Sequence, residues 1–92
     1  MDEYYRSEKF KKLLSRYESF RNGEHGVAIL DSEEIIDVAE FYYAIRNISE
    51  AVEAADLALA IYPGATTPLA FKARLAANDE KDYHKALDII EM

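Results

Sequence analysis

The stretch SEEIIDVAEFYYAIRNISEAVEAADLALAIYP, residues 32–63, decides the fold of this chain. Its apolar residues recur at intervals of three and four, the spacing of one buried helical stripe. A polar pair, Arg46-Asn47, interrupts the pattern, and Pro63 ends it, because proline lacks an amide and disfavours helix at the residue before it. The stretch therefore predicts two helices joined by a short turn, a helical hairpin.

The first helix has a start signal at Asp31. The Asp31 carboxylate can accept the amide of Glu34, and the Glu34 side chain can reach back to the Asp31 amide, which makes a capping box. Leu30 and Ile35 occupy the positions of a hydrophobic staple, which would set the angle at which the chain enters the helix. We expect the helix to begin directly after Asp31.

Small residues mark the inner side of the second helix. Alanine at positions 51, 54, 55 and 58 lets two helix backbones approach closely, at no cost in helix propensity. Two short antiparallel helices cannot bury their apolar stripes alone, so other parts of the chain must pack against them.

The hairpin resembles the tetratricopeptide repeat, in which a large apolar residue, Leu-Gly, Tyr, Ala, Phe, Ala and a closing Pro recur over about 34 residues. The positions that match at the family's spacing are Ile35, Val38, Ala39, Tyr42, Ala51, Ala55, Ala58 and Pro63. The departures are Ile35 for Trp, Ala39 for Gly and Ala55 for Phe. The resemblance implies an all-α fold in which antiparallel helical hairpins stack as a short α-solenoid.

The chain divides into four segments, which we expect to form a single small domain over residues 1–92. The segments are an accessory N-terminal helix (1–22), a loop or extended linker (23–31), the first hairpin (32–65) and a second, truncated hairpin (66–92). The second hairpin is less regular, because Lys72 stands where the repeat usually has leucine. Since it ends without a cap, we expect a fragment of a longer repeat protein.

Three local predictions concern the ends of these segments. The apolar stripe of the N-terminal segment predicts one helix over residues 3–21, ended by Asn22-Gly23. In the linker, Val27 and Ile29 could lie across the gap between helices as an apolar tether, which we favour, or they could form a short exposed strand that pairs with a partner. In the second hairpin, Thr67 is expected to cap a helix whose first residue is Pro68.

The charge is distributed unevenly along the chain, which carries a net charge of −7. Residues 22–62 contain one cationic residue, Arg46, against nine carboxylates. An acidic body repels phosphate backbones and anionic lipids, so neither nucleic acid nor a membrane is expected as a partner. There is no cysteine, no signal-peptide pattern and no apolar run long enough to cross a bilayer, so we expect a cytoplasmic protein.

Three basic residues, Lys9, Lys12 and Arg16, lie along one side of the N-terminal helix. They could contact a membrane surface or an acidic partner, or they could form a solvated face on which Glu8 pairs with Lys12. We favour the solvated face, because such rows are common on surface helices.

No constellation of residues indicates catalysis or a cofactor. His84 and Asp88, four residues apart, could supply two metal ligands, whereas zinc needs three or four. Paired catalytic acids need a pocket, which short helix pairs seldom form. We therefore expect no enzyme activity, no metal and no cofactor.

The resemblance implies a concave groove, lined by the first helices of successive repeats, that holds a peptide or helix of a partner protein. The residues expected on this groove are Glu33, Ile36, Glu40, Tyr43, Asn47, Arg74 and Asn78. Tyr43 is the strongest candidate, because an aromatic ring with a polar tip suits a binding groove. Arg74 could instead pair with Glu40 inside it.

The groove residues also narrow the class of partner. Some members of the family grip a C-terminal carboxylate with basic and polar residues, but here Ile36 and Glu40 stand at those positions, so that function is not supported. An acidic groove favours a basic or polar ligand. The leading hypothesis is thus a protein–protein interaction scaffold, and the alternative is a structural module that forms a homodimer through its exposed last helix.

Overall fold

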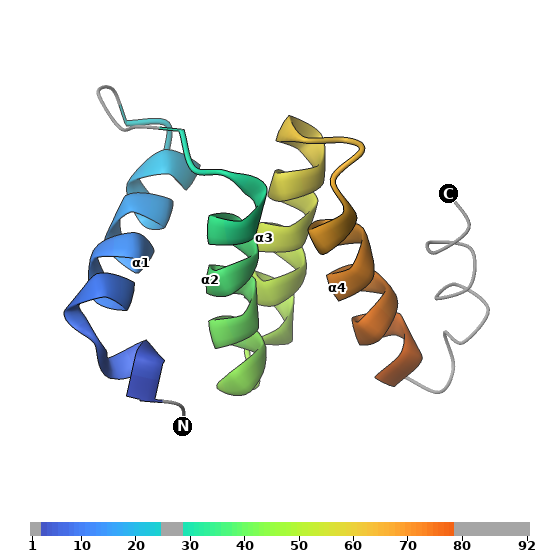
Figure 1. Ribbon diagram of the computed structural model, residues 1–92, viewed down its shortest axis with the longest axis horizontal. Coiled ribbons are helices and arrows are strands. Elements are labelled where there is room, and N and C mark those ends of the chain that lie inside the picture. The colour runs from blue at the N-terminus through green and yellow to red at the C-terminus, as the bar shows by residue number, and fades with distance from the viewer. Residues whose placement is uncertain (1–2, 25–28, 79–92) are drawn as a thin grey trace.

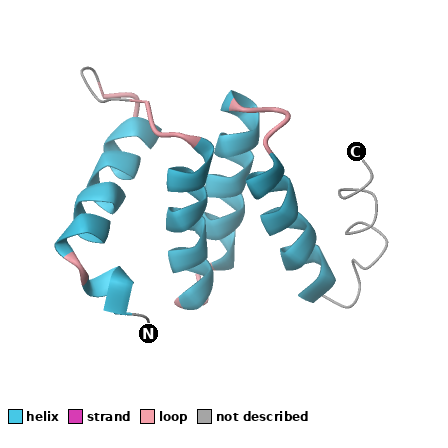
Figure 2. Ribbon diagram, in the orientation of Figure 1, coloured by secondary structure: helices cyan, strands magenta, loops and turns pink. Residues whose placement is uncertain are grey.

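The computed structural model describes residues 3–24 and 29–78 of the chain, all of them in helices, turns or loops without a strand (Figure 2). The elements in chain order are the 3-10 helix η1 (Glu3–Arg6) and the α-helices α1 (Glu8–Arg21), α2 (Ser32–Ala44), α3 (Ile48–Ile61) and α4 (Thr66–Asn78). Successive helices run in opposite directions, and α2 lies between α1 and α4 (Figure 1). The all-α prediction is confirmed. The part of the predicted second hairpin that follows residue 78 lies outside the described residues.

The start of α2 follows the sequence prediction. The Asp31 carboxylate accepts the amide of Glu34 at 2.7 Å, and the Glu34 carboxylate accepts the amide of Asp31 at 3.1 Å. Leu30 and Ile35 on either side are fully buried in the same core. The predicted capping box is confirmed, and the helix begins at Ser32.

Helices α2 and α3 form the predicted hairpin. The four alanines of α3 that were expected to face α2, at positions 51, 54, 55 and 58, all have no exposed surface. A three-residue turn joins the helices, and its central residue, Arg46, has a left-handed backbone with φ of 66°. The amides of Arg46 and Asn47 donate to the carbonyls of Tyr43 and Tyr42 at 3.0 and 2.8 Å. This is a Schellman motif, which satisfies carbonyls at the end of α2.

The N-terminal segment differs from the single helix predicted over residues 3–21. Ser7 separates η1 from α1: its hydroxyl donates to the carbonyl of Tyr4 at 2.6 Å and accepts the amide of Phe10 at 3.1 Å. A side chain that satisfies a free amide in this way starts a new helix. The predicted end at Asn22-Gly23 is confirmed, since Gly23 has φ of 74°.

Helix α1 is attached to the hairpin by apolar and charged contacts. Phe10, Leu13 and Tyr17 are buried in the core shared with α2 and α3. At its C-terminal end, the Arg21 guanidinium lies 2.5 Å from Glu50 and 3.6 Å from Glu53, both on α3. A basic helix is thus held against acidic residues of the hairpin.

Two of the local predictions are wrong. Ile29 is 72% exposed and cannot serve as a tether, whereas the next residue, Leu30, is fully buried; Val27 lies outside the described residues. Helix α4 begins at Thr66, so Pro68 is its third residue and Thr67 is not its cap. Proline is tolerated at this position because the first four amides of a helix have no partner within it.

Helix α4 packs against both helices of the hairpin, α2 and α3. Phe71 provides the apolar anchor and is 2% exposed. Lys72, the departure from the repeat pattern, forms an ion pair with Asp56 on α3. Within the described ranges, no helix is long and apolar enough to span a bilayer.

Candidate interaction surface

The residues expected on the groove come from α2, from the turn that follows it and from α4, and α2 and α4 lie against each other. On α2 they are spaced by three and four residues, so they share one side of the helix. We call the surface formed by Glu33, Glu40, Tyr43, Asn47 and Arg74 the α2–α4 face. It is built on two helices whose relative position depends on the packing of Phe71.

Phe71 is the centre of this surface. The ring of Tyr43 meets it edge to face, with centroids 6.3 Å apart and an interplanar angle of 85°. The guanidinium carbon of Arg74 lies 5.3 Å from the centroid of the same ring, an arrangement that favours a cation over the aromatic face. Arg74 and Tyr43, 31 positions apart in the chain, are thus brought to one aromatic side chain.

Arg74 also forms an ion pair with Glu40 of α2. The sequence left open whether these two groups face a ligand or pair with each other, and in this structure they pair. Both side chains retain exposed surface, 53% for Arg74 and 36% for Glu40. A partner can therefore reach the pair from solvent, and it must compete with an existing interaction to use either group.

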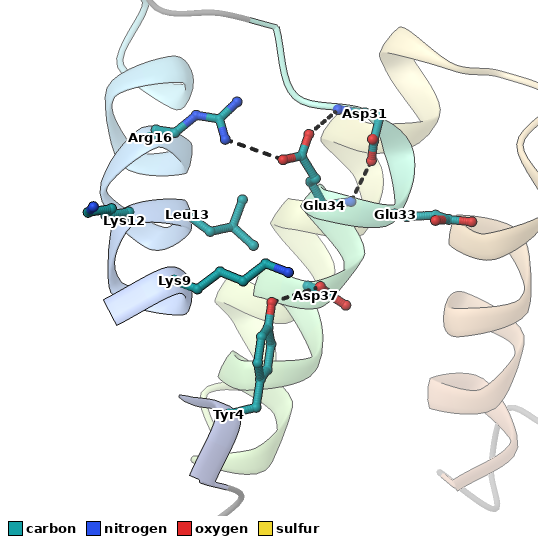
Figure 3. Close-up of a pocket in the computed structure, with 9 residues that line it drawn as sticks. All are labelled: Tyr4, Lys9, Lys12, Leu13, Arg16, Asp31, Glu33, Glu34 and Asp37. Carbon is teal, nitrogen blue, oxygen red and sulfur yellow. Dashed lines mark hydrogen bonds and ion pairs between the residues drawn. The ribbon is translucent and has the colours of Figure 1, made fainter. Parts of the chain in front are cut away.

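The other residues expected on the groove whose side chains are described differ in how far they are exposed to solvent. Glu33 is exposed in the first turn of α2, and its side chain points away from α1 (Figure 3). Asn47 is exposed and precedes α3, where its side chain accepts no amide of the helix. Ile36, by contrast, is only 5% exposed and belongs to the core, so its expected place on the groove is wrong. Asn78 is the last residue of α4, and its side chain lies outside the described part.

The distribution of charge on the α2–α4 face follows from these positions. The opposite charges of Glu40 and Arg74 compensate each other, whereas Glu33 has no cationic partner among the described residues. The face therefore combines a neutral pair, an amide and an aromatic ring with one free carboxylate. These groups can bind polar and basic side chains through hydrogen bonds and charge, with the aromatic ring as an apolar contact.

Some interactions that shape the surface were not predicted. Phe71 receives both Tyr43 and Arg74, and the ion pair between Asp56 and Lys72 joins α3 to α4 through residues 16 positions apart. No local spacing signals such contacts, because they depend on how the helices pack. On α1, Glu8 pairs with Lys11 at 3.6 Å and not with Lys12, so that expected pair is wrong.

In the described part of the chain, no group of three or more His, Cys, Asp or Glu side chains is arranged to hold a metal ion. His84 and Asp88, considered above as ligands, lie outside that part. The arrangement on the α2–α4 face is thus one of contact groups that are held in place by packing and pairing. Comparisons of the chain with family models, with curated proteins and with solved structures find no match.

Proposed function

We propose that the chain is a tetratricopeptide-like interaction module, which binds a peptide or a helix of a partner protein on the α2–α4 face. The observation that carries the proposal is the packing of α4 against both α2 and α3. This packing sets the first helix of one predicted repeat beside the first helix of the next, the arrangement on which a groove of this family depends.

The side chains on the face are suited to contact with a polypeptide. Tyr43 is held edge to face by Phe71, so its ring is already ordered before a partner arrives, which lowers the entropic cost of binding. Arg74 and Glu40 offer one donor group and one acceptor group, and Glu33 adds a free carboxylate. A partner segment with basic or polar side chains complements this set.

The test uses two double variants that remove matched ion pairs. Glu40→Gln with Arg74→Gln removes the pair between α2 and α4, and Asp56→Asn with Lys72→Gln removes the pair between α3 and α4. Each leaves the net charge unchanged, and each is expected to cost at most about 1 kcal/mol of stability, as for exposed ion pairs. Circular dichroism and thermal melting establish that both variants fold alike.

Proteins from the source cells are captured on wild-type chain, identified by mass spectrometry and then purified for direct binding measurements. We expect the partner to bind the Asp56/Lys72 variant as it binds the wild type, and to bind the Glu40/Arg74 variant at least about tenfold more weakly. Equal binding to all three chains would place the contact elsewhere. Recovery of only this chain itself would support the alternative, self-assembly into a homodimer.

A further inference from the structure

A second concave site lies between α1 and the first two turns of α2 (Figure 3). Its volume is about 510 Å³, within the range of sites that hold small ligands. Basic residues of α1 form one wall, acidic residues of α2 form the other, and Leu13 lies between them. The cleft shares Glu33 with the α2–α4 face but none of the packing around Phe71.

Two interactions cross the cleft and hold its walls together. The Arg16 guanidinium lies 3.3 Å from the Glu34 carboxylate at one end. At the other end, the Tyr4 hydroxyl donates a 3.2 Å hydrogen bond to Asp37. Both carboxylate oxygens of Glu34 have a partner, since the oxygen that does not face Arg16 accepts the amide of Asp31 at 3.1 Å. The cleft is therefore formed before any ligand arrives, and Arg16 and Glu34 maintain its shape.

Other polar groups of the cleft remain available. Lys9 forms no hydrogen bond or ion pair with the residues that the structure describes, and its side chain extends from α1 toward α2 (Figure 3). Asp37 engages one carboxylate oxygen with Tyr4, so its other oxygen can accept a further donor. Leu13, 6% exposed, adds a small apolar surface to the cleft, beside Lys9 on the same helix (Figure 3).

We propose that this cleft binds a short peptide with both termini free, whose carboxylate contacts Lys9 and whose ammonium group contacts Asp37. A ligand of one sign would meet a like charge on one of the walls, which is unfavourable. A zwitterion complements both walls at once, and its apolar side chains can cover Leu13. Two or three residues have an extended reach of about 7–10 Å, a size that suits a cleft of about 510 Å³.

The test is a titration of the 92-residue chain, labelled with ¹⁵N, followed through the amide signals of its NMR spectrum. The probe is the tripeptide Ala-Leu-Ala with free termini, and the matched probe is the same tripeptide acetylated at its N-terminus and amidated at its C-terminus. We expect saturable shifts for amides of residues 9–16 and 31–37 with the free probe only. The same tripeptide with only one terminus blocked is expected to bind about tenfold more weakly than the free probe.

Variants of the chain separate the two walls. Lys9→Met and Asp37→Asn are each expected to weaken binding of the free probe about tenfold. Lys11→Met removes a lysine of α1 that pairs with Glu8 and does not line the cleft, and it should bind as the wild type does.

Three results would overturn the proposal. The first is the absence of a saturable shift up to about 10 mM probe, since an affinity below that is far weaker than a specific site requires. The others are equal binding of the blocked tripeptide and shifts confined to residues outside 9–16 and 31–37. The experiment is independent of the proposed function, since neither Lys9 nor Asp37 belongs to the α2–α4 face. Loss of one site leaves the other testable.

Discussion

The hydroxyl of Tyr62, at the end of α3, donates a 2.7 Å hydrogen bond to the carbonyl of Leu30, which precedes α2. The two residues are 32 positions apart and join the open end of the hairpin. Leu30 is fully buried, so its carbonyl has little access to water. The bond therefore closes the hairpin at the end opposite its three-residue turn.

Removal of this hydroxyl should destabilise the fold. Tyr62→Phe leaves a buried carbonyl without its donor, and we expect the free energy of unfolding to fall by about 1–2 kcal/mol. Urea denaturation followed by circular dichroism measures the change. Tyr42→Phe is the control, because the Tyr42 hydroxyl bonds to no described residue, and it should change stability by less than about 0.5 kcal/mol. Equal effects of the two substitutions would contradict the assigned role.

The hydroxyl of Tyr17 is in the opposite situation. Tyr17 has no exposed surface, and its oxygen has no hydrogen-bond partner among the described residues. A buried polar group without a partner costs about 1–3 kcal/mol, so Tyr17→Phe should raise the free energy of unfolding by about 1 kcal/mol. The same urea experiment measures it, and a loss of stability would show that the hydroxyl is bonded in solution.

Alkaline pH should destabilise the wild type through the same side chain. Burial raises the pKa of Tyr17 from 10.0 to about 12. Between these values the unfolded chain releases the proton and the folded chain retains it, so the free energy of unfolding falls as pH rises, by up to about 1.4 kcal/mol per pH unit.

The advantage of Tyr17→Phe over the wild type should therefore widen from roughly pH 10 upward, since the variant lacks this group. Urea denaturation of both chains over a series of alkaline buffers gives the difference, in which the titration of all other groups cancels. A constant difference across the range would show that the pKa of Tyr17 does not change on folding.

Replacing Arg46, in the turn between α2 and α3, with glycine should stabilise the fold. Arg46 has φ of 66°, a conformation that costs a residue with a side chain about 1 kcal/mol and glycine very little. Arg46→Gly should raise the free energy of unfolding by about 0.5–1 kcal/mol, after allowance for the greater freedom of glycine in the unfolded chain. Thermal melting measures the gain.

The control for this substitution is Ala60→Gly, at an exposed position inside α3 with ordinary helical backbone. Glycine there should destabilise the chain by about 1 kcal/mol. If both substitutions destabilise alike, Arg46 is not strained in solution.

The alanines of α3 should tolerate no larger side chain. Ala58 has no exposed surface and belongs to the shared core, so Ala58→Leu must push packed helices apart and should cost about 1–3 kcal/mol. Ala60→Leu, two residues further along and exposed, should stay within about 0.5 kcal/mol of wild type. Urea denaturation compares them, and a neutral Ala58→Leu would mean that the interface is loosely packed.

Predictions from the sequence were right at three points where the cause lies within a few residues. The capping box of Asp31 and Glu34, the end of α1 at Gly23 and the break at Arg46 each depend on hydrogen bonds or backbone angles of near neighbours. Other local predictions failed: Thr67 is not the cap of α4, and Glu8 does not pair with Lys12. At Ser7, the apolar stripe that continues through it suggested one helix, although Ser7 is a start signal for α1. Helix α1 and its apolar stripe are present as predicted, and only the separation of η1 from α1 was missed.

The candidate site could be predicted only in part. The family resemblance placed Glu40 and Tyr43 on one side of α2 and Arg74 opposite them, and both α2 residues do contact side chains of α4. It could not show that Ile36, on the same stripe, is covered by neighbouring elements. Spacing defines the side of a helix, whereas burial depends on what is packed against that side.

The sequence alone thus determined the two helices of the hairpin, the capping box at its start and the end of α1, because these follow from interactions over one to five positions. Only the tertiary structure decided which distant groups meet: Arg74 with Glu40, Arg21 with Glu50, Tyr62 with Leu30, and the walls of the cleft between α1 and α2. These contacts depend on the angles and distances at which whole helices pack, and those are set by the fit of many side chains at once.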